Sequence, residues 1–284
     1  MSEFDMERRR TVVGASEVAL LFGLPSFGNR TLSDLWFEKK YGVERADNGN
    51  ASTKLGLQLE AAVLAAAEDR LGVQIVDRQL WLTKDANAAT LDGRVAGGGP
   101  LVEAKTSGIV GPSKVSEWGD ELTDEVPDNY LVQVQAQLLV SGAELAYLAA
   151  LIGGRGFGLF QIVPQPELQT AIATKSSEFI ASLAADCAPG APPQLETLKR
   201  IRRQPKKVVE INDELRERFE EAKANAKIAD ETKEQFQREL LAAMGDAESG
   251  VCRGGQFTYY EQTNRYPAKP ASETTFRVLR WKKD

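Results

Sequence analysis

Two predicted strands, 88–95 and 100–106, bring two carboxylates and a lysine to one place. Asp92 lies in TLDGRV, and Glu103 and Lys105 follow in LVEAKTS after a glycine-rich turn at 97–100. Side chains alternate between the two faces of a strand, so Glu103 and Lys105 project to the same side. Pairing of the two strands would place Asp92 beside Glu103. Such a group suits metal-dependent phosphodiester hydrolysis, in which Mg²⁺ takes oxygen ligands and activates water, and a lysine stabilises the transition state. The alternative is an ion pair on an exposed strand.

Glu60 lies in a predicted helix over 54–71 and is expected to face the protein interior. Its neighbours on that helix face are all apolar: Leu57, Leu64, Ala67 and Leu71. A buried carboxylate is costly unless it is paired or binds a metal, and that face offers no partner. The sequence therefore adds Glu60 to the metal site, unless the helix is rotated so that Glu60 reaches solvent.

The predicted helix over 128–141 carries three glutamines. Gln133 and Gln137 lie one turn apart on one face, and Tyr130 lies one turn before Gln133. Glutamines in this arrangement can hold a water, a metal-bound solvent molecule or a phosphate. The alternative is a solvated helix face.

Composition excludes several kinds of chemistry. The 284 residues contain no histidine, so histidine-dependent nucleophilic catalysis and histidine-ligated zinc are absent. Two distant cysteines, Cys187 and Cys252, cannot form a four-thiolate metal site or a disulfide framework. The charged start of the chain does not resemble a signal peptide, and no apolar run reaches the ~18 residues of a membrane span. We therefore expect a soluble, cytoplasmic protein without membrane contact.

The net charge of the chain does not indicate a protein that binds nucleic acid non-specifically. The net charge is −6, whereas a non-specific nucleic-acid binder would be basic. Basic residues nevertheless cluster at 8–10, 199–207 and 277–283, and a nuclease needs positive charge only locally. The alternative for each cluster is a solvated surface or a linker.

The order of predicted elements indicates an α/β fold, with a mixed β-sheet flanked by helices on both faces. Further helices are expected at 14–23, 31–41 and 165–186, with Ser16 capping the first of these, Thr31 or Ser33 the second, and Asp128 the helix at 128–141. Further strands are expected at 73–82, 144–152 and 157–163. Three prolines within 187–195 mark a boundary. This divides the chain into a core domain at 1–195 and an extension at 196–284, which holds one or two charged helices over 210–244 and short strands near 250–260 and 274–281.

Taken in order, the motifs GASEVALLFG, LWFEKKYG, LGLQLEAAV, TLDGRV, VEAK and NYLVQVQAQLLVSG resemble the phage lambda exonuclease / YqaJ-type viral recombinase family of PD-(D/E)xK nucleases. The resemblance covers roughly residues 8–185 and implies a restriction-endonuclease-like fold. It implies that Asp92, Glu103, Lys105 and Gln133 are catalytic, and that Glu60 joins Asp92 and Glu103 at the metal. Leu91 departs from the proline that the family often has before the aspartate.

The resemblance also implies a pocket for a 5′-terminal phosphate. Ser16 and an upstream arginine fit it, and spacing favours Arg9, although Arg8 and Arg10 remain alternatives. We assign Tyr130 and Gln135 to the same group of DNA contacts. The implied activity is Mg²⁺-dependent digestion, with Mn²⁺ as a possible substitute, of one strand of double-stranded DNA from its ends, in the 5′→3′ direction. The implied partners are a single-strand annealing protein and further copies of the chain, as a trimer, in a bacterial or phage-infected cell.

Two other functions stay open at this point. A structure- or site-specific endonuclease could use the same fold and would not need Arg9 and Ser16. A binding protein could keep the nuclease fold as a scaffold and act through residues 196–284.

Overall fold

The computed structural model describes residues 3–26, 29–43, 51–107 and 115–261, without the side chains of 3–6 and 51–53. The described residues fall into two compact units, one ending at Arg202 and the other beginning at Arg203. In the described part of the chain, no helix is long and apolar enough to cross a membrane.

The first unit contains a mixed five-stranded sheet in the order β2-β5-β6-β7-β8. The strands β6 and β7 are parallel, and the other neighbours are antiparallel. The bounds of the five strands are β2 (Ile75–Val76), β5 (Gly93–Val95), β6 (Leu101–Ser107), β7 (Ala146–Ile152) and β8 (Gly156–Ile162). A second mixed sheet has the order β1-β4-β3, with β1 (Val13–Gly14), β3 (Leu80–Lys84) and β4 (Asn87–Leu91).

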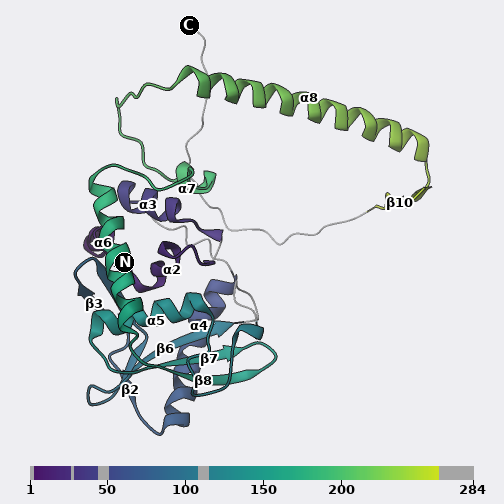
Figure 1. The fold of residues 1–284 in the computed structure, drawn as a ribbon. Coiled ribbons are helices and arrows are strands. Elements are labelled where there is room, and N and C mark those ends of the chain that lie inside the picture. Colours follow the sequence, from purple (N-terminus) through teal and green to yellow (C-terminus); the bar gives the residue numbers. More distant parts are fainter. Residues whose placement is uncertain (1–2, 27–28, 44–50, 108–114, 262–284) are drawn as a thin grey trace. The chain divides into compact units, whose positions relative to one another are not determined.

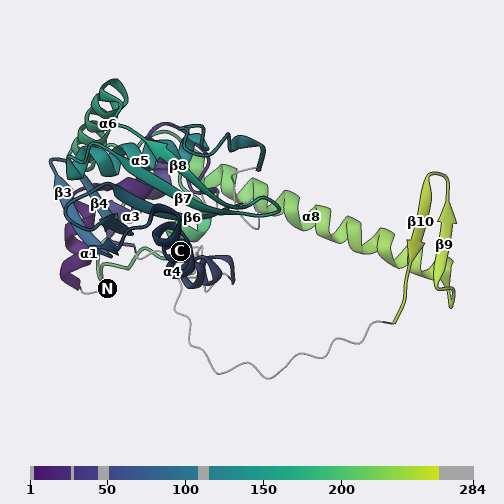
Figure 2. The same cartoon turned by 90° about the horizontal axis from the view of Figure 1, so that it is seen from below.

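Helices cover both faces of the large sheet (Figures 1 and 2). The helix α4 (Ala51–Leu71) packs on one face, where Leu64 and Ala67 contact Val102 and Ala104 in a buried apolar cluster. The helix α5 (Asp128–Ser141) lies on the other face, within the larger apolar core. The mixed α/β architecture expected from the sequence is confirmed.

The remaining elements of the first unit surround this core. Thr31 accepts a hydrogen bond from the Asp34 amide and begins one of these helices, in agreement with one of the two expected caps. Their bounds are α1 (Glu3–Arg10), the 3₁₀ helix η1 (Ala15–Glu17), α2 (Val18–Leu21), α3 (Leu32–Tyr41), the 3₁₀ helix η3 (Val115–Glu117), α6 (Pro166–Ala184) and α7 (Leu195–Lys199).

The predicted strand over 73–82 is wrong in one respect, because it is two strands in two different sheets. Asp77 and Gln79 adopt positive φ angles of 54° and 59° between β2 and β3, and this left-handed backbone interrupts the strand. The predicted strand over 88–95 is likewise divided, with Asp92 between β4 and β5. Asp92 therefore sits where the chain passes from one sheet to the other.

Two predicted helix caps are also wrong. Pro127, not Asp128, is the N-cap of α5. Gly14, not Ser16, precedes the short helix η1, where the Glu17 carboxylate accepts a hydrogen bond from the Gly14 amide at 2.9 Å. Ser16 is thereby left exposed at the surface.

The second unit contains one long helix and a hairpin. The helix α8 spans Asp213–Met244 without interruption, which decides between the one or two helices expected there. The strands β9 (Ser249–Cys252) and β10 (Gly255–Thr258) pair antiparallel. The strand expected at 274–281 lies outside the described residues.

Candidate active site

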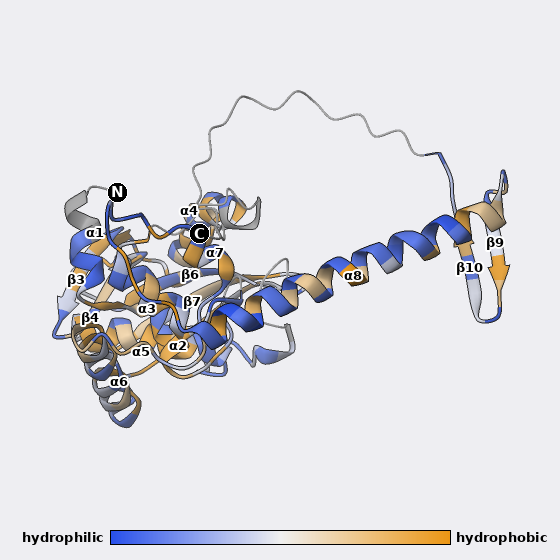
Figure 3. Cartoon of the chain, turned by 90° about the horizontal axis from the view of Figure 1, so that it is seen from above, coloured by the Kyte–Doolittle hydropathy of each residue, from blue (hydrophilic) through white to orange (hydrophobic). Residues whose placement is uncertain are grey.

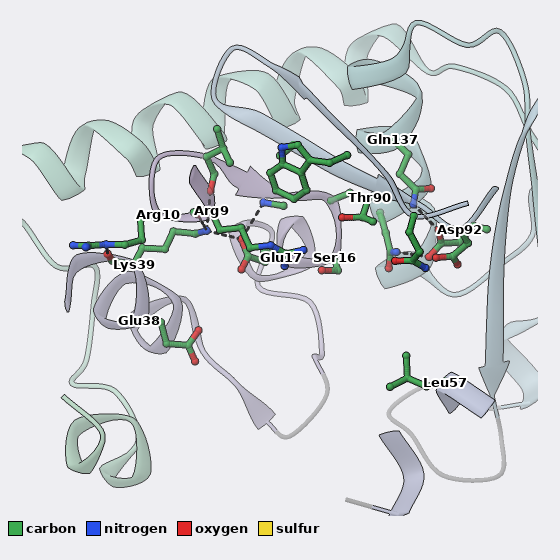
Figure 4. Close-up of a pocket in the computed structure, with 18 of the residues that line it drawn as sticks. Arg9, Arg10, Ser16, Glu17, Glu38, Lys39, Leu57, Thr90, Asp92 and Gln137 are labelled. Atoms are coloured by element: carbon green, nitrogen blue, oxygen red, sulfur yellow. Dashed lines mark hydrogen bonds and ion pairs between the residues drawn. The ribbon is translucent and has the colours of Figure 1, made fainter. Parts of the chain in front are cut away.

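A pocket of about 390 Å³ gathers most of the residues that the sequence predicts to be functional. Asp92 lies beside Gln137 in one part of it, and Arg9 lies near Ser16 in another (Figure 4). The predicted site residues among its lining are Arg9, Ser16, Glu60, Asp92, Glu103, Lys105 and Gln133. Tyr130 and Gln135 are not among its lining residues.

Glu103 is the most firmly held of the carboxylates. It is only 2% exposed. Gln133 and Gln137 of α5 donate hydrogen bonds to its two oxygens, and the Lys105 ammonium also contacts it. A buried carboxylate with this many donors is held in a fixed orientation. The shared direction of Glu103 and Lys105 follows from their spacing of two in β6.

Asp92 lies close to Glu103 in an unfavourable electrostatic position. Burial and the neighbouring Glu103 carboxylate raise the pKa of Asp92 to about 8, against the opposing effects of Lys105 and of the Ala104 amide. That amide donates a hydrogen bond to Asp92 Oδ2 at 2.9 Å. The protein thus holds two carboxylates near each other although their charges repel.

Lys105 balances part of this negative charge. Burial disfavours its ammonium, but the Glu103 and Asp92 carboxylates outweigh burial and raise the pKa of Lys105 above its ordinary value. Lys105 is therefore charged at neutral pH. Its Nζ lies 5.6 Å from the centre of the Tyr130 ring, so Tyr130 stands beside the pocket as the aromatic neighbour of the lysine.

The raised pKa of Asp92 predicts a specific pH dependence of stability. Without metal, Asp92 takes up a proton on folding between its unfolded pKa of about 4 and its folded pKa of about 8. Because the unfolded chain binds fewer protons in this window, the free energy of unfolding falls as pH rises, by at most about 1.4 kcal/mol per pH unit. Asp92→Asn should remove this part of the slope in urea unfolding with a chelator present. The exposed Asp69→Asn is the control, and an unchanged slope in Asp92→Asn contradicts the prediction.

Glu60 lines the same pocket from α4, but it is less buried than the sequence suggested. It is half-buried, and Gln79 donates a hydrogen bond to its carboxylate at 3.1 Å, so it does have a partner. Leu57, expected to point inward beside it, is 67% exposed. The helix is thus rotated relative to the expected orientation, although the Glu60 charge still contributes to the raised pKa of Asp92.

The donor chemistry fits a magnesium ion. No group of three or more His, Cys, Asp and Glu side chains in the described residues is arranged to hold a metal ion. Mg²⁺, however, is usually bound by one or two protein carboxylates together with water and substrate phosphates. The Asp92–Glu103 pair offers only oxygen donors, and a divalent cation would relieve the repulsion that raises the Asp92 pKa.

The structure distinguishes among the three consecutive arginines. Arg9 lies over the Trp81 ring, with 4.9 Å between the guanidinium carbon and the ring centre. Arg10 instead donates to the backbone carbonyls of Lys39 and Lys40 at 2.8 and 2.9 Å, which ties it to α3. Arg8 is not among the pocket-lining residues. Of the three, Arg9 is therefore the best placed to receive an anion in the pocket.

A cluster of buried charges holds the Arg9–Ser16 segment in place. The Lys39 ammonium donates to the carbonyls of Arg9 and Val12 at 2.8 and 2.7 Å. It also forms an ion pair of 2.8 Å with Glu17, which neighbours Ser16. Burial disfavours the Glu17 charge, but Lys39 and Arg30 outweigh burial and lower its pKa. The cluster fixes the backbone that carries Arg9 and Ser16.

Gln135 does not belong to the pocket. Its side chain is fully buried on another face of α5, where it donates to the Val163 carbonyl at 2.7 Å and accepts from the Gln165 amide at 2.9 Å. A residue enclosed in this way cannot contact DNA, so the expectation of a DNA contact does not fit this placement. Gln135 joins α5 to the start of α6.

Gln137, Trp81 and Lys39 are among the lining residues that were not assigned to the site from the sequence. Gln137 could have been found, because it shares a helix face with Gln133. Trp81 and Lys39 gave no usable signal, because their roles depend on contacts with residues far away in the chain.

Comparison with known proteins agrees with the motif-based resemblance. Residues 6–144 match the model of the YqaJ-like viral recombinase domain. The chain is 31% identical over 182 residues to the uncharacterized protein YqaJ of Bacillus subtilis (strain 168). That match covers 62% of this chain and 54% of the relative, so it spans about half of the relative's length.

Solved structures with partial similarity include an alkaline exonuclease, LHK-Exo, from Laribacter hongkongensis, with a TM-score of 0.49 and 19% identity over 65% of this chain and 94% of that one. A phage-related exonuclease from Haemophilus somnus 129PT matches with a TM-score of 0.47 and 13% identity, covering 62% of this chain and 96% of that one.

Proposed function

We propose, from the match of residues 6–144 to the model of the YqaJ-like viral recombinase domain, that this chain is a Mg²⁺-dependent exonuclease acting on ends of double-stranded DNA. The observation that carries the proposal is the pocket itself. A pair of repelling carboxylates and a charged lysine share one cavity with an arginine that can bind an anion.

Asp92 and Glu103 are the residues that would hold Mg²⁺, with Glu60 at the edge of the same site. When bound, the metal would supply activation of a water molecule and neutralisation of charge on the scissile phosphate. Mn²⁺ prefers similar oxygen ligands and is the expected substitute.

The chain's own residues supply orientation and charge. Gln133 and Gln137 position the two oxygens of Glu103, and the Ala104 amide positions Asp92. Lys105 carries a positive charge next to both carboxylates, so it can stabilise negative charge that develops on a phosphate in the transition state. Because the strands and α5 fix these groups before DNA binds, little reorganisation is needed during the reaction.

The other part of the pocket supports a preference for DNA ends. Arg9 and the exposed hydroxyl of Ser16 lie in the same cavity as the carboxylates. A terminal phosphate bound there would place the first phosphodiester bonds of that strand near Asp92 and Glu103. This arrangement favours digestion in the 5′→3′ direction. We further propose that the product strand is passed to a single-strand annealing protein and that the chain acts as a homo-oligomer, a trimer by family resemblance.

Digestion of linear and of closed-circular duplex DNA with Mg²⁺ tests the proposal. We expect linear DNA to be degraded, faster from 5′-phosphorylated than from 5′-hydroxyl ends, and circular DNA to remain intact. Cutting of the circle would instead establish an endonuclease. Failure to cut either substrate would contradict the nuclease proposal and favour a binding protein that acts through residues 196–284.

Arg9→Ala should selectively reduce the preference for phosphorylated ends. The reason is that Arg9 is the pocket-lining arginine whose guanidinium lies over Trp81 rather than on backbone carbonyls. Loss of one charge-assisted contact of about 1.5–3 kcal/mol corresponds to a roughly 10- to 100-fold smaller rate difference between 5′-phosphate and 5′-hydroxyl substrates. Arg8→Ala is the matched control, and an equal loss in both variants would refute a specific role of Arg9.

A further inference from the structure

The helix α8 carries a regular apolar seam that nothing in the described structure covers. Its positions recur at alternating intervals of four and three residues. All of them are apolar except one, which is Lys233. Within this helix only Met244 is buried. Figure 3 shows a predominantly hydrophilic helix with apolar residues at intervals. We call the following positions the α8 seam: Leu215, Phe219, Ala222, Ala226, Ala229, Lys233, Phe236, Leu240 and Ala243.

Spacing of this kind is the signature of helices that pair along their length. A mean interval of 3.5 residues keeps one stripe facing a partner helix over many turns. The large residues of the stripe are exposed here, with Leu215, Phe219 and Phe236 at 57%, 49% and 60%. Exposed aromatic residues in such a stripe indicate an interface rather than a solvated arm.

Large and small side chains follow one another along the seam in nearly the same order whether α8 is followed from its N-terminal or from its C-terminal end. When two copies are placed antiparallel, Leu215 meets Leu240, Phe219 meets Phe236, and Ala226 meets Ala229 of the other copy. A two-fold interface requires a surface that complements itself in this way. The remaining layer places Lys233 opposite the small Ala222, which leaves room for its long side chain.

The charges flanking the seam agree with the antiparallel direction. In this register Arg218 lies opposite Glu239 and Lys223 lies opposite Asp230, and the two-fold symmetry repeats both pairs. A parallel pair would instead place Arg218 near Lys223 and stack Lys233 on its own copy. The same side chains thus favour one direction and oppose the other.

We propose that α8 pairs antiparallel with α8 of a second copy of this chain. This contact is independent of the nuclease pocket and of any contact made by the first unit. The seam and its flanking charges support this pairing, and neither depends on the proposed exonuclease activity.

Cross-linking of the full chain tests the direction and register of the pair. On a Cys187→Ser/Cys252→Ser background, Arg218→Cys and Glu239→Cys variants are prepared separately. We expect disulfide-linked species after the two are mixed, because residues 218 and 239 lie opposite each other. Arg218→Cys alone should not link, because the two copies of residue 218 are then about 28 Å apart along the helix axis. Cross-linking of Arg218→Cys with itself, or no specific linkage in the mixture, would overturn the proposal.

Sedimentation of variants tests which residues hold the pair together. Phe219→Glu/Phe236→Glu should weaken the α8 contact at least about 100-fold, because it removes the largest apolar side chains of the seam. The control is Ile228→Glu, since Ile228 is equally exposed at 61% but lies off the seam. Unchanged association in the double variant, or an equal loss in the control, would show that the α8 seam does not hold the two copies together.

A charge reversal separates the antiparallel from the parallel pair. Glu239→Arg should weaken association by roughly 3- to 30-fold, and Arg218→Glu/Glu239→Arg should restore it. In a parallel pair Arg218→Glu alone would strengthen association, which would contradict the proposed direction.

Discussion

Glu103→Gln should reduce DNA cleavage by at least about 10³-fold while leaving the protein folded. Glu103 is a proposed metal ligand, and loss of its charge removes several kcal/mol of metal-dependent transition-state stabilisation. Single-turnover digestion of linear duplex DNA with saturating Mg²⁺ measures the effect. Wild-type-like cleavage would exclude Glu103 from the reaction.

The control for this variant is Glu144→Gln, which makes the same chemical change at an exposed position outside the pocket. Its activity should match that of the wild type. Glu103→Gln also replaces one of the two acceptor oxygens by an NH2 group. The side-chain amide of Gln133 or Gln137 then loses its acceptor, at a cost of about 1–3 kcal/mol in stability. The melting temperature should therefore be compared in both variants, so that lost activity is not confused with unfolding.

Lys105→Met should lower the cleavage rate by roughly 10²–10³-fold with little change in DNA affinity. Its ammonium lies beside both proposed metal ligands, and the Glu103 and Asp92 carboxylates keep it charged. Its main contribution is therefore expected in the transition state rather than in ground-state binding. The rate of bond cleavage and the dissociation constant for an uncleaved duplex end, measured with Ca²⁺, would separate the two effects.

Lys84→Met provides the comparison for Lys105→Met. Lys84 lies in β3, outside the pocket, and donates to the Leu139 carbonyl at 3.3 Å. We expect its cleavage rate to stay near the wild-type value. A loss of DNA affinity in Lys105→Met that accounts for its entire rate defect would contradict a transition-state role.

Local patterns in the sequence determined the mixed α/β class, the positions of most helices and the shared direction of Glu103 and Lys105. These features depend on residues close together in the chain. Alternation in a strand fixes the side of Glu103 and Lys105 regardless of what packs against them. The Glu103–Lys105 pair could therefore be assigned before its neighbours were known, and the order of the motifs gave the family resemblance that the domain match supports.

Only the tertiary structure decided which glutamines of α5 reach Glu103 and which of the two pocket-lining arginines, Arg9 and Arg10, lies over Trp81. Gln133 and Gln137 reach Glu103, whereas Gln135 is enclosed near α6, and each of these partners lies about 30 residues away in the chain. Arg9 and Arg10 differ because one meets Trp81 and the other the carbonyls of α3. Neighbouring residues of the same type have the same local preferences, so only long-range packing and electrostatics can separate their roles.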